Sequence, residues 1–402
     1  MRVLFLTPQP PWPPHAGPAI RNYQLIAGAA TQHQVYVLCF GDSDTDLTAL
    51  KEICSWAGWV ARPQSTLRDR ILHLLRSSEP DLAFRLQSEA FAERLRFILA
   101  HQHFDLIQFE GLEMVPHLAL ARRESPNSLL VLDEHNVEYL LQERISATSQ
   151  SLGRWYSRIQ ARRLRQYESN ALASSDGWIT VSKVDESYLE PLSSGKPHTV
   201  IPIGVDPEKQ GAQGVPLAPL PRLFFAGKLD YRPNRDGLRW FCTKVWPLIR
   251  SEVPTVEFIV AGSGVGLERR WLRQPGIQSL GYLDDREFAQ ALGSAWVSVV
   301  PVQAGSGMRV KILESFLWAK PVATTSIGIE GIEAAPGEHV RIGDTPEDLA
   351  GHVVDLLRDR LLAQEQGLAA KRLAEELYDW RRFTPRLLEF YGRLHESRDG
   401  YV

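Results

Sequence analysis

The sequence predicts an α/β protein with two doubly wound domains, each built on a parallel sheet. Short, almost continuous apolar stretches alternate with amphipathic helical stretches, which is the pattern of parallel strands covered on both faces. The alternation starts again after residues 207–222, a stretch rich in Pro and Gly that lacks periodicity. A length of 402 residues also suits two or three domains. We therefore place the first domain at residues 1–206 and the second at 207–380.

Composition indicates an ordinary soluble protein. Hydrophobic residues make up 44% and charged residues 23%, and the net charge of -3 gives no reason to expect nucleic acid as a partner. The three cysteines are widely spaced, which suits neither a disulfide framework nor a zinc site. No stretch has the roughly 18 apolar residues of a membrane span, and the apolar residues 3–6 are too few for a signal peptide. We therefore expect a cytoplasmic protein.

The first half contains six predicted strands: residues 3–6, 34–40, 105–110, 128–133, 177–182 and 198–206. Ligands of open parallel sheets bind beyond the carboxyl ends of the strands. After the first strand, a Pro-rich loop with Gly17 leads into a helix that begins near residues 18–20. This loop either faces a ligand or is a plain connection stiffened by its prolines.

His135 is the candidate functional residue of this half. It follows the strand at residues 128–133 and stands among the carboxylates Asp133, Glu134 and Glu138. A lone histidine is most often structural, but carboxylates beside an imidazole can shift its charge state near neutral pH. Its place at the carboxyl end of a strand favours a role in ligand chemistry.

Two basic helical stretches have alternative interpretations. Residues 67–76 place apolar side chains opposite three arginines, so this helix either lies on an anionic membrane or packs its apolar side on the core. Residues 151–176 combine five arginines with Trp155 and Tyr156. Because no recognisable nucleic-acid fold accompanies them, we favour a helix that faces solvent or a substrate.

The second half begins with two glycine turns of the kind that bind phosphate. The strand at residues 223–226 leads into Gly227 and Lys228. The strand at 256–261 leads into the glycines of 262–266, which fit a loose dinucleotide-binding fingerprint. The acidic residue of that fingerprint would be Asp284 or Asp285, which falls in a turn after a strand near 277–281.

The most informative stretch is residues 301–332. A strand at 295–301 is followed by Gly305, Ser306 and Gly307, and a helix starts directly afterwards. Such a turn lets the backbone approach a ligand, and the helix presents unpaired amides and a partial positive charge. The turn therefore suits an anion.

Charged residues on the following helix refine this prediction. Arg309 and Lys311 add positive charge, and Glu314 shares a helix face with Lys311, where a carboxylate can hold sugar hydroxyls. The pattern indicates a nucleotide or nucleotide-sugar; the alternative is an ordinary surface ion pair beside a turn. A strand at residues 320–325 and helices at 345–358 and 361–377 complete this half.

The run Gly-x-Gly-x-Arg-x-Lys-Ile-Leu-Glu at residues 305–314, with Gly-Ile-Glu-Gly-Ile at 328–332, resembles the donor-site signature of family 4 glycosyltransferases. The resemblance implies the GT-B fold, with two Rossmann-like domains facing across a cleft. It also implies retention of the anomeric configuration, no metal and no cofactor. In that fold the terminal helix, here about 381–402, packs back on the first domain.

The resemblance also implies roles for individual residues. Arg309, Lys228 and the backbone amides at Gly305, Ser306, Gly307 and Met308 would stabilise the departing diphosphate, with Lys311 adding charge and Glu314 holding the ribose. Lys228 matches the first member of the family's basic pair, whereas the second position is Asn234. Further donor contacts would come from Gly17, Gly227, Gly281 and Tyr282. His135 would reach the transferred sugar and steady the anomeric centre through its carbonyl or ring.

The expected function is a retaining transfer of a hexose from a nucleoside-diphosphate sugar to a hydroxyl acceptor, in bacterial polysaccharide or glycolipid assembly. The acceptor would be a carbohydrate, a lipid-linked compound or a small molecule, and peripheral membrane contact would suit a lipid acceptor. One departure concerns the donor sugar, because Ser306 stands where the family usually has a glutamate. Alternatives are an epimerase or hydrolase of the same fold, an NAD-type dehydrogenase and a binding protein without activity.

Overall fold

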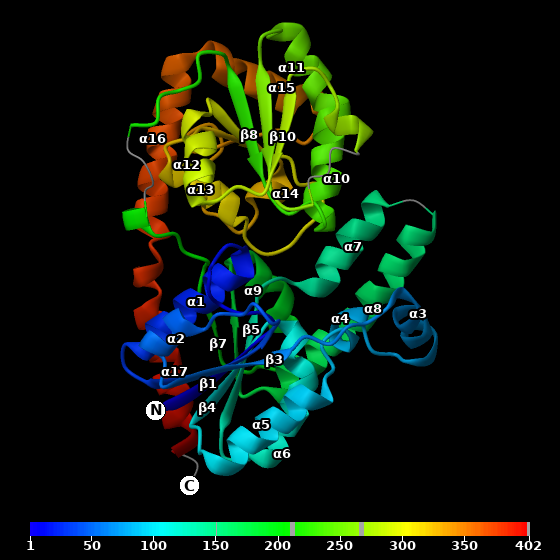
Figure 1. Ribbon diagram of the computed structural model, residues 1–402, viewed down its shortest axis with the longest axis vertical. Helices are drawn as coiled ribbons and strands as arrows, with labels where there is room; N and C mark the ends of the chain where they lie inside the picture. Colours follow the sequence, from blue (N-terminus) through cyan, green and yellow to red (C-terminus); the bar gives the residue numbers. More distant parts are fainter. Residues whose placement is uncertain (150, 210–213, 265–268, 400–402) are drawn as a thin grey trace. The chain divides into compact units, whose positions relative to one another are not determined.

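The structure is a computed structural model that describes residues 1–149, 151–209, 214–264 and 269–399. The chain forms two compact units: Met1–Ile203 with Trp380–Val402 is unit 1, and Gly204–Asp379 is unit 2. Each unit has its own parallel sheet with helices on both faces (Figure 1). The predicted α/β fold with two doubly wound sheets is therefore confirmed. The sequence placed the boundaries after residues 206 and 380.

Unit 1 contains a seven-stranded sheet in which all neighbouring strands are parallel, in the order β3-β2-β1-β4-β5-β6-β7. The central strands are buried along almost their whole length, which explains their continuous apolar runs. The strands are β1 (Arg2–Thr7), β2 (Gln34–Gly41), β3 (Trp56–Ala61), β4 (Leu106–Glu110), β5 (Leu129–Glu134), β6 (Gly177–Thr180) and β7 (His198–Val200).

Strand β3 was not predicted, because the sequence reading assigned helical and connecting material after Asp42. In this strand only Ala57 is buried, and Trp59 is 40% exposed. An edge strand has one neighbour and partly faces solvent, so it lacks the apolar run by which the central strands are recognised.

The helices of unit 1 cover both faces of this sheet (Figure 1). They are α1 (Gly17–Ala30), α2 (Thr48–Ile53), α3 (Leu67–Arg76), α4 (Asp81–Phe84), α5 (Glu89–His101), α6 (Leu118–Glu124), α7 (Glu138–Thr148), α8 (Ser151–Ser174), α9 (Lys183–Leu189) and α17 (Thr384–Asp399). The 3-10 segments η1 (Leu112–His117), η2 (Glu190–Leu192) and η6 (Trp380–Arg382) connect them.

The terminal helix α17 packs within unit 1, against α1 and β7. Its side chains Leu387, Phe390 and Leu394 are buried. Gly177 in β6 has no side chain, and a Cβ there would lie 2.9 Å from a methyl carbon of Leu394. The last helix of the chain therefore completes the core of the unit that the first residues begin.

Helix α3 does not bury its apolar side in the described structure. None of its residues is buried, and Leu67, Ile71 and Leu75 are 71%, 50% and 73% exposed. The expectation that this side packs on the core is therefore wrong for these three residues. A capping box between Thr66 and Asp69 supports the start of the helix instead.

Unit 2 contains a six-stranded parallel sheet in the order β10-β9-β8-β11-β12-β13. Its strands are β8 (Arg222–Ala226), β9 (Glu257–Ala261), β10 (Ile277–Gly281), β11 (Val297–Val300), β12 (Val322–Thr324) and β13 (Arg341–Ile342). Its helices are α10 (Arg232–Trp240), η4 (Phe241–Val245, a π segment), α11 (Trp246–Glu252), α12 (Asp285–Ser294), α13 (Val310–Leu317), α14 (Ser326–Ile329), α15 (Pro346–Arg358) and α16 (Arg360–Leu377), with 3-10 segments η3 (Pro207–Lys209) and η5 (Arg270–Leu272).

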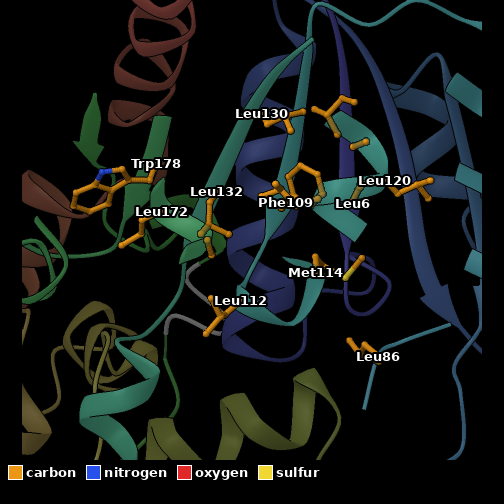
Figure 2. Packing of buried hydrophobic residues seen from close by; sticks show 14 of the residues in the cluster. Leu6, Leu86, Phe109, Leu112, Met114, Leu120, Leu130, Leu132, Leu172 and Trp178 are labelled. Carbon is orange, nitrogen blue, oxygen red and sulfur yellow. The ribbon is translucent and has the colours of Figure 1, made fainter. Parts of the chain in front are cut away.

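Each unit has a separate hydrophobic core. In unit 1, side chains from the sheet and its covering helices pack together; Figure 2 shows Phe109 and Leu132 from the sheet and Leu172 from α8 among others. In unit 2, Trp246 and Phe258 pack with their ring centroids 5.6 Å apart beneath α11 and α15. Among the described residues, no helix is long and apolar enough to cross a membrane.

Candidate active site

In unit 2, the predicted anion-binding turn lies between β11 and α13. Gly305, Ser306, Gly307 and Met308 are all buried, and Gly307 has a φ of +71°, a conformation that glycine adopts without strain. Arg309 is the N-cap position of α13, and within the described part of the chain no side-chain hydrogen bond caps that helix end. The first amides of α13 thus follow directly after a glycine turn, which is a ready-made site for an anion.

Arg309 braces this turn from inside. Its guanidinium donates to the carbonyl oxygens of Ser306 at 2.5 Å and of Gly307 at 2.6 Å. A Cβ at Gly305 would lie 2.1 Å from an Arg309 guanidinium nitrogen, so glycine is needed for this close approach. The cation therefore fixes the shape of the turn and adds positive charge to it.

Lys311 reaches from α13 to the first glycine turn of unit 2. Its Nζ donates to Asn234 Oδ1 at 2.8 Å and lies 4.6 Å from the centre of the Phe225 ring. A Cβ at Gly227 would be 2.6 Å from this Nζ, so the glycine provides the space for the lysine. The alternative of a surface Lys311–Glu314 ion pair is not what the structure shows, because the amine is directed to Asn234.

Asn234 links three parts of this site. Its Oδ1 accepts from Lys311, and its Nδ2 donates to the carbonyl oxygen of Lys228 at 3.0 Å. The side chain of Lys228 is exposed, while the Leu229 amide donates to the carbonyl oxygen of Ser263. The residue in the position of the family's second base therefore holds Lys311, which supplies the charge from another helix.

Burial sets the charge states on this helix. Desolvation, with a smaller contribution from the nearby Arg309, lowers the pKa of Lys311 to about 7, while Glu314 opposes the change. Burial raises the pKa of Glu314, and Lys311 partly offsets this effect. Among the described residues, the Glu314 carboxylate accepts no hydrogen bond, so its acceptor sites are available to a ligand.

The other predicted donor residues lie at loop ends. Gly281 ends β10 with a φ of +72°, and its carbonyl oxygen accepts from the Gly262 amide at 2.6 Å. Tyr282 follows it and is 61% exposed. In unit 1, Gly17 is the first residue of α1.

The dinucleotide fingerprint gains no support from its acidic residue. Residues 265–268 lie outside the described part of the chain. Asp284 accepts from the Glu287 amide at 2.7 Å and is the N-cap of α12. Its carboxylate therefore has a local structural role at a helix start.

In unit 1, His135 belongs to a buried network at the carboxyl ends of β4 and β5. Its Nε2 lies 3.1 Å from Glu110 Oε2 and 3.2 Å from Asp133 Oδ2. Arg21 from α1 donates to both oxygens of Asp133 at 2.7 and 2.5 Å. The same guanidinium donates to the Ile201 carbonyl oxygen at 2.6 Å. Two carboxylates therefore face two groups that carry positive charge.

The shifted pKa values follow from this arrangement. Burial alone would lower the pKa of His135, but hydrogen bonds and attraction from Asp133 and Glu110 raise it to about 9. Burial would raise the pKa of Asp133, but Arg21 and His135 hold it well below its usual value. Burial and the nearby Asp133 raise the pKa of Glu110 to about 7. His135 is therefore an imidazolium at neutral pH.

Glu110, Asp133 and His135 place possible metal-ligating atoms within 4.8 Å of one another. These atoms are already used, since both Asp133 oxygens accept from Arg21 and the histidine Nε2 faces both carboxylates. A cation would have to displace the Arg21 guanidinium, which holds both oxygens of Asp133. The side chains of Arg21 and Asp133 are only 1% and 0% exposed. The cluster therefore suits an internal ion network rather than a metal ion.

Sequence reasoning identified His135 and the neighbouring Asp133 but missed Arg21 and Glu110. Arg21 lies in the middle of an amphipathic helix, and Glu110 ends a strand with no nearby motif. The only signal in the sequence is their position. Glu110 stands at the carboxyl end of its strand, and Arg21 lies on the helix that follows the first strand.

Comparison with known proteins shows two family matches. The description Glycosyltransferase Family 4 matches residues 16–209, and Glycosyl transferases group 1 matches residues 220–359. A phosphatidyl-myo-inositol mannosyltransferase from Propionibacterium freudenreichii is 27% identical over 176 residues, or 42% of this chain and 43% of that protein. An uncharacterized 44.6 kDa protein in the cps region of Klebsiella pneumoniae is 24% identical over 164 residues, or 39% and 42%. The chain thus matches less than half the length of these curated relatives.

Several solved structures have the same fold. Sucrose-phosphate synthase from Thermosynechococcus elongatus has a TM-score of 0.75 at 18% identity, covering 99% of this chain and 100% of that one. HepE from Anabaena, in complex with UDP-glucose, has a TM-score of 0.67 at 14% identity, with 98% and 100% covered. TarM has a TM-score of 0.70 at 11% identity, with 97% and 99% covered. The fold is therefore the GT-B fold.

Within that class, the chain belongs to the group 1 glycosyltransferases of family 4. The resemblance seen at residues 305–314 is thereby confirmed.

Proposed function

We propose that the protein transfers a hexose from a nucleoside-diphosphate sugar to a hydroxyl acceptor, with retention of the anomeric configuration. The observation that carries the proposal is the turn at Gly305–Met308. The turn leads directly into the N-terminus of α13, where Arg309 and Lys311 add positive charge. HepE was solved with UDP-glucose and UDP, and TarM with UDP, which supports a nucleotide-sugar donor here.

Unit 2 supplies the groups that a departing diphosphate needs. Negative charge develops on the leaving phosphate, and the amides of the turn together with Lys311 and Arg309 are preorganised donors for it. The exposed Lys228 can follow the phosphate as charge develops. Glu314 holds the ribose hydroxyls, and the backbone at Gly281 and Tyr282 contacts the nucleobase.

Unit 1 supplies His135. Because its ring is an imidazolium, the ring cannot stabilise a cationic anomeric centre, and that role falls to its carbonyl oxygen. The ring is suited to donate a hydrogen bond to a sugar hydroxyl or phosphate oxygen. The acceptor hydroxyl passes its proton to the leaving phosphate, so the reaction needs no protein nucleophile, metal or cofactor.

The donor nucleotide can be identified by a thermal-shift screen. UDP, GDP or ADP should raise the melting temperature, whereas NAD should not. Stabilisation by NAD alone would favour the dehydrogenase. Release of the nucleotide from the matching nucleotide-sugar without transfer would favour a hydrolase, and recovery of an isomerised donor would favour an epimerase. Proton NMR of the glycoside product then tests retention.

Two substitutions test the assigned residues. Glu314→Ala should weaken nucleotide binding about 10- to 100-fold, because a hydrogen bond from the ribose to a charged acceptor is lost. Glu376→Ala, an exposed position on α16, is its matched control. His135→Ala should lower kcat by about 100-fold, and the exposed His101→Ala is its control. Wild-type turnover in either test variant removes that residue from the site.

The acceptor is a carbohydrate, a lipid-linked compound or a small molecule. The relative from a cps region and the phosphatidyl-myo-inositol mannosyltransferase both suit a role in bacterial polysaccharide or glycolipid assembly. The exposed apolar side of α3 would suit peripheral contact with a membrane that holds a lipid acceptor. Arginines at positions 68 and 76 flank this side and would attract anionic lipid.

Membrane contact is tested by co-sedimentation with vesicles of anionic or neutral lipid. The wild type should bind anionic vesicles, and replacement of Leu67, Ile71 and Leu75 by Ser should abolish binding. Leu361→Ser is the matched control, because Leu361 on α16 is 73% exposed, as is Leu75. Equal binding by the triple variant and the control would rule out α3 as the contact.

A further inference from the structure

We propose that Glu110, held by Gln108 and Tyr391, is a positioning residue that keeps the His135 ring in one orientation and one charge state for the ligand. The inference rests on the proposed function, since it explains how the histidine of that site is prepared. It concerns three fully buried residues, which act through the histidine.

A chain of hydrogen bonds connects the terminal helix to the histidine. The Tyr391 hydroxyl on α17 donates to Gln108 Oε1, and Gln108 Nε2 donates to Glu110 Oε1 at 2.6 Å. The other oxygen of Glu110 contacts His135 Nε2. Tyr391, Gln108 and Glu110 are each 0% exposed, so water does not compete for these bonds.

Tyr391 determines which way the Gln108 amide points. With the hydroxyl donating to its oxygen, the amide must present its nitrogen to Glu110. Without the hydroxyl, the amide oxygen loses its donor, and the amide is held only through its nitrogen. The tyrosine thus acts on Glu110 through one intermediate side chain.

Glu110 is also held from a second side. The amide of Asn22 on α1, oriented with its nitrogen as donor, lies 2.8 Å from Glu110 Oε2 and 3.0 Å from the Pro18 carbonyl oxygen. Glu110 therefore receives bonds from Gln108, Asn22 and His135, which leaves its carboxylate little freedom to move.

This network decides what His135 offers to a ligand. Nε2 faces the carboxylates in either charge state, so the second ring nitrogen, Nδ1, is left for other partners. In the neutral ring, Nε2 keeps its proton and Nδ1 can only accept; in the imidazolium, Nδ1–H donates. A donor suits a sugar hydroxyl or phosphate oxygen, so the carboxylates select the useful form.

The charged and titratable groups that face the ring come from several elements. They are Asp133 on β5, Glu110 on β4, Arg21 on α1, Glu138 on α7 and Glu113 on η1, with Tyr391 on α17 behind Glu110. The pKa of His135 is about 9, so the donor form persists through neutral pH and is lost as pH rises through that value. Removal of the Glu110 charge should move this loss to lower pH.

The test combines histidine NMR with kinetics on the full-length chain. Nitrogen-15 spectra of labelled protein, with His135→Ala for assignment, should show His135 as an imidazolium at neutral pH. Glu110→Gln should lower the pKa of His135, and the alkaline limb of kcat/KM should move to lower pH by the same amount. Tyr391→Phe should lower kcat about 3- to 10-fold with nucleotide affinity unchanged.

Tyr139→Phe is the matched control, because Tyr139 is a buried tyrosine of the same unit outside this chain of bonds. It should change neither the His135 pKa nor kcat. A wild-type His135 that titrates at its ordinary value, or a Glu110→Gln variant with an unchanged His135 pKa, overturns the inference while leaving the proposed function standing. Absence of any glycosyl transfer overturns the proposed function, and the NMR result still decides whether the network fixes the ring.

Discussion

At the scale of single residues, Lys311 shows how this chain compensates for a changed position. The resemblance places Asn234 where the family has a basic residue, and its amide holds the amine of Lys311, which comes from a different helix. The same burial that positions the amine also lowers its pKa to about 7. The charge that should bind the diphosphate is therefore sensitive to pH in the range where the enzyme would work.

We expect the Lys311 charge to appear in the pH dependence of nucleotide binding. The amine is charged below about pH 7 and neutral above it in the free protein, so its contribution falls as pH rises through that value. Lys311→Met keeps the stem over Phe225 and removes the charge. Calorimetric titration with the stabilising nucleotide should show affinity about 10- to 100-fold weaker than wild type below pH ~7, with the gap narrowing above it. Titration of the nucleotide's phosphates affects the wild type and the variant equally, so it cancels in the comparison. A difference in affinity that does not change with pH would contradict the prediction.

At the scale of elements, close backbone contacts position the helices that carry the site. Gly237 in α10 lies against the end of β11, where a Cβ would come within 2.2 Å of the Pro301 carbonyl oxygen. The obstructing atoms belong to the backbone and cannot rotate away. Helix α10 thereby reaches the depth at which Asn234 meets Lys311.

Gly237→Ala should therefore lower the free energy of unfolding of unit 2 by about 1–3 kcal/mol. Gly351→Ala is the matched control, since Gly351 is also helical and an added Cβ meets nothing within 4 Å. That change should raise stability by about 0.5–1 kcal/mol, because alanine favours helix. Thermal denaturation of both variants checks this; equal effects would mean that the contact at Pro301 relaxes freely.

The end of β5 also carries an unpaired buried carboxyl group. Glu134 is 1% exposed, and within the described residues neither of its carboxyl oxygens has a hydrogen-bond partner. Burial, followed by repulsion from Glu168 and Glu138, raises its pKa well above the ordinary 4.5. The folded state thus holds a proton that the unfolded chain releases.

The stability contributed by this proton is fully present below pH 4.5 and is lost as pH rises through the raised value. Glu134→Gln, which is neutral at every pH, should therefore flatten the dependence of melting temperature on pH for unit 1. The variant should approach the wild type at about pH 5 and exceed it at about pH 8. A parallel pair of curves would show that Glu134 does not titrate on unfolding.

At the scale of the whole molecule, unit 1 is assembled from two distant segments of the chain. Helix α17 follows the whole of unit 2 in sequence, yet Leu387 and Tyr391 are both 0% exposed within unit 1. The terminal segment is therefore part of the first unit's core, and a change in it should act on unit 1.

Leu387→Ala should destabilise unit 1 by about 2–5 kcal/mol, because it leaves a cavity in that core. The control is Leu361→Ala, which changes a 73% exposed side chain and should have little effect. Scanning calorimetry with and without nucleotide separates the two units, since only the unit 2 transition should rise with ligand. Loss of stability in the ligand-responsive transition would contradict the assignment of α17 to unit 1.

Much of the fold and the donor turn could be predicted from the sequence because their signals are local. The apolar run of a central strand and the Gly-Ser-Gly turn before Arg309 both act on neighbouring residues. Strand β3 escaped prediction because an edge strand has no such run. Packing of the apolar side of α3 on the core was one of two expectations, and it was wrong. The periodicity of a sequence shows that a helix has an apolar side, but it does not show what covers that side.

By itself, the sequence determined the two α/β sheets, the family signature at residues 305–314 and the place of His135 at the end of a strand. Only the tertiary structure decided that Lys311 is held by Asn234 and that His135 sits between Glu110 and Asp133, with Tyr391 behind. Apart from the neighbours Asp133 and His135, these partners lie 25 to 283 residues apart. Charge states inside a protein depend on burial and on groups brought together by folding, and no local pattern records either.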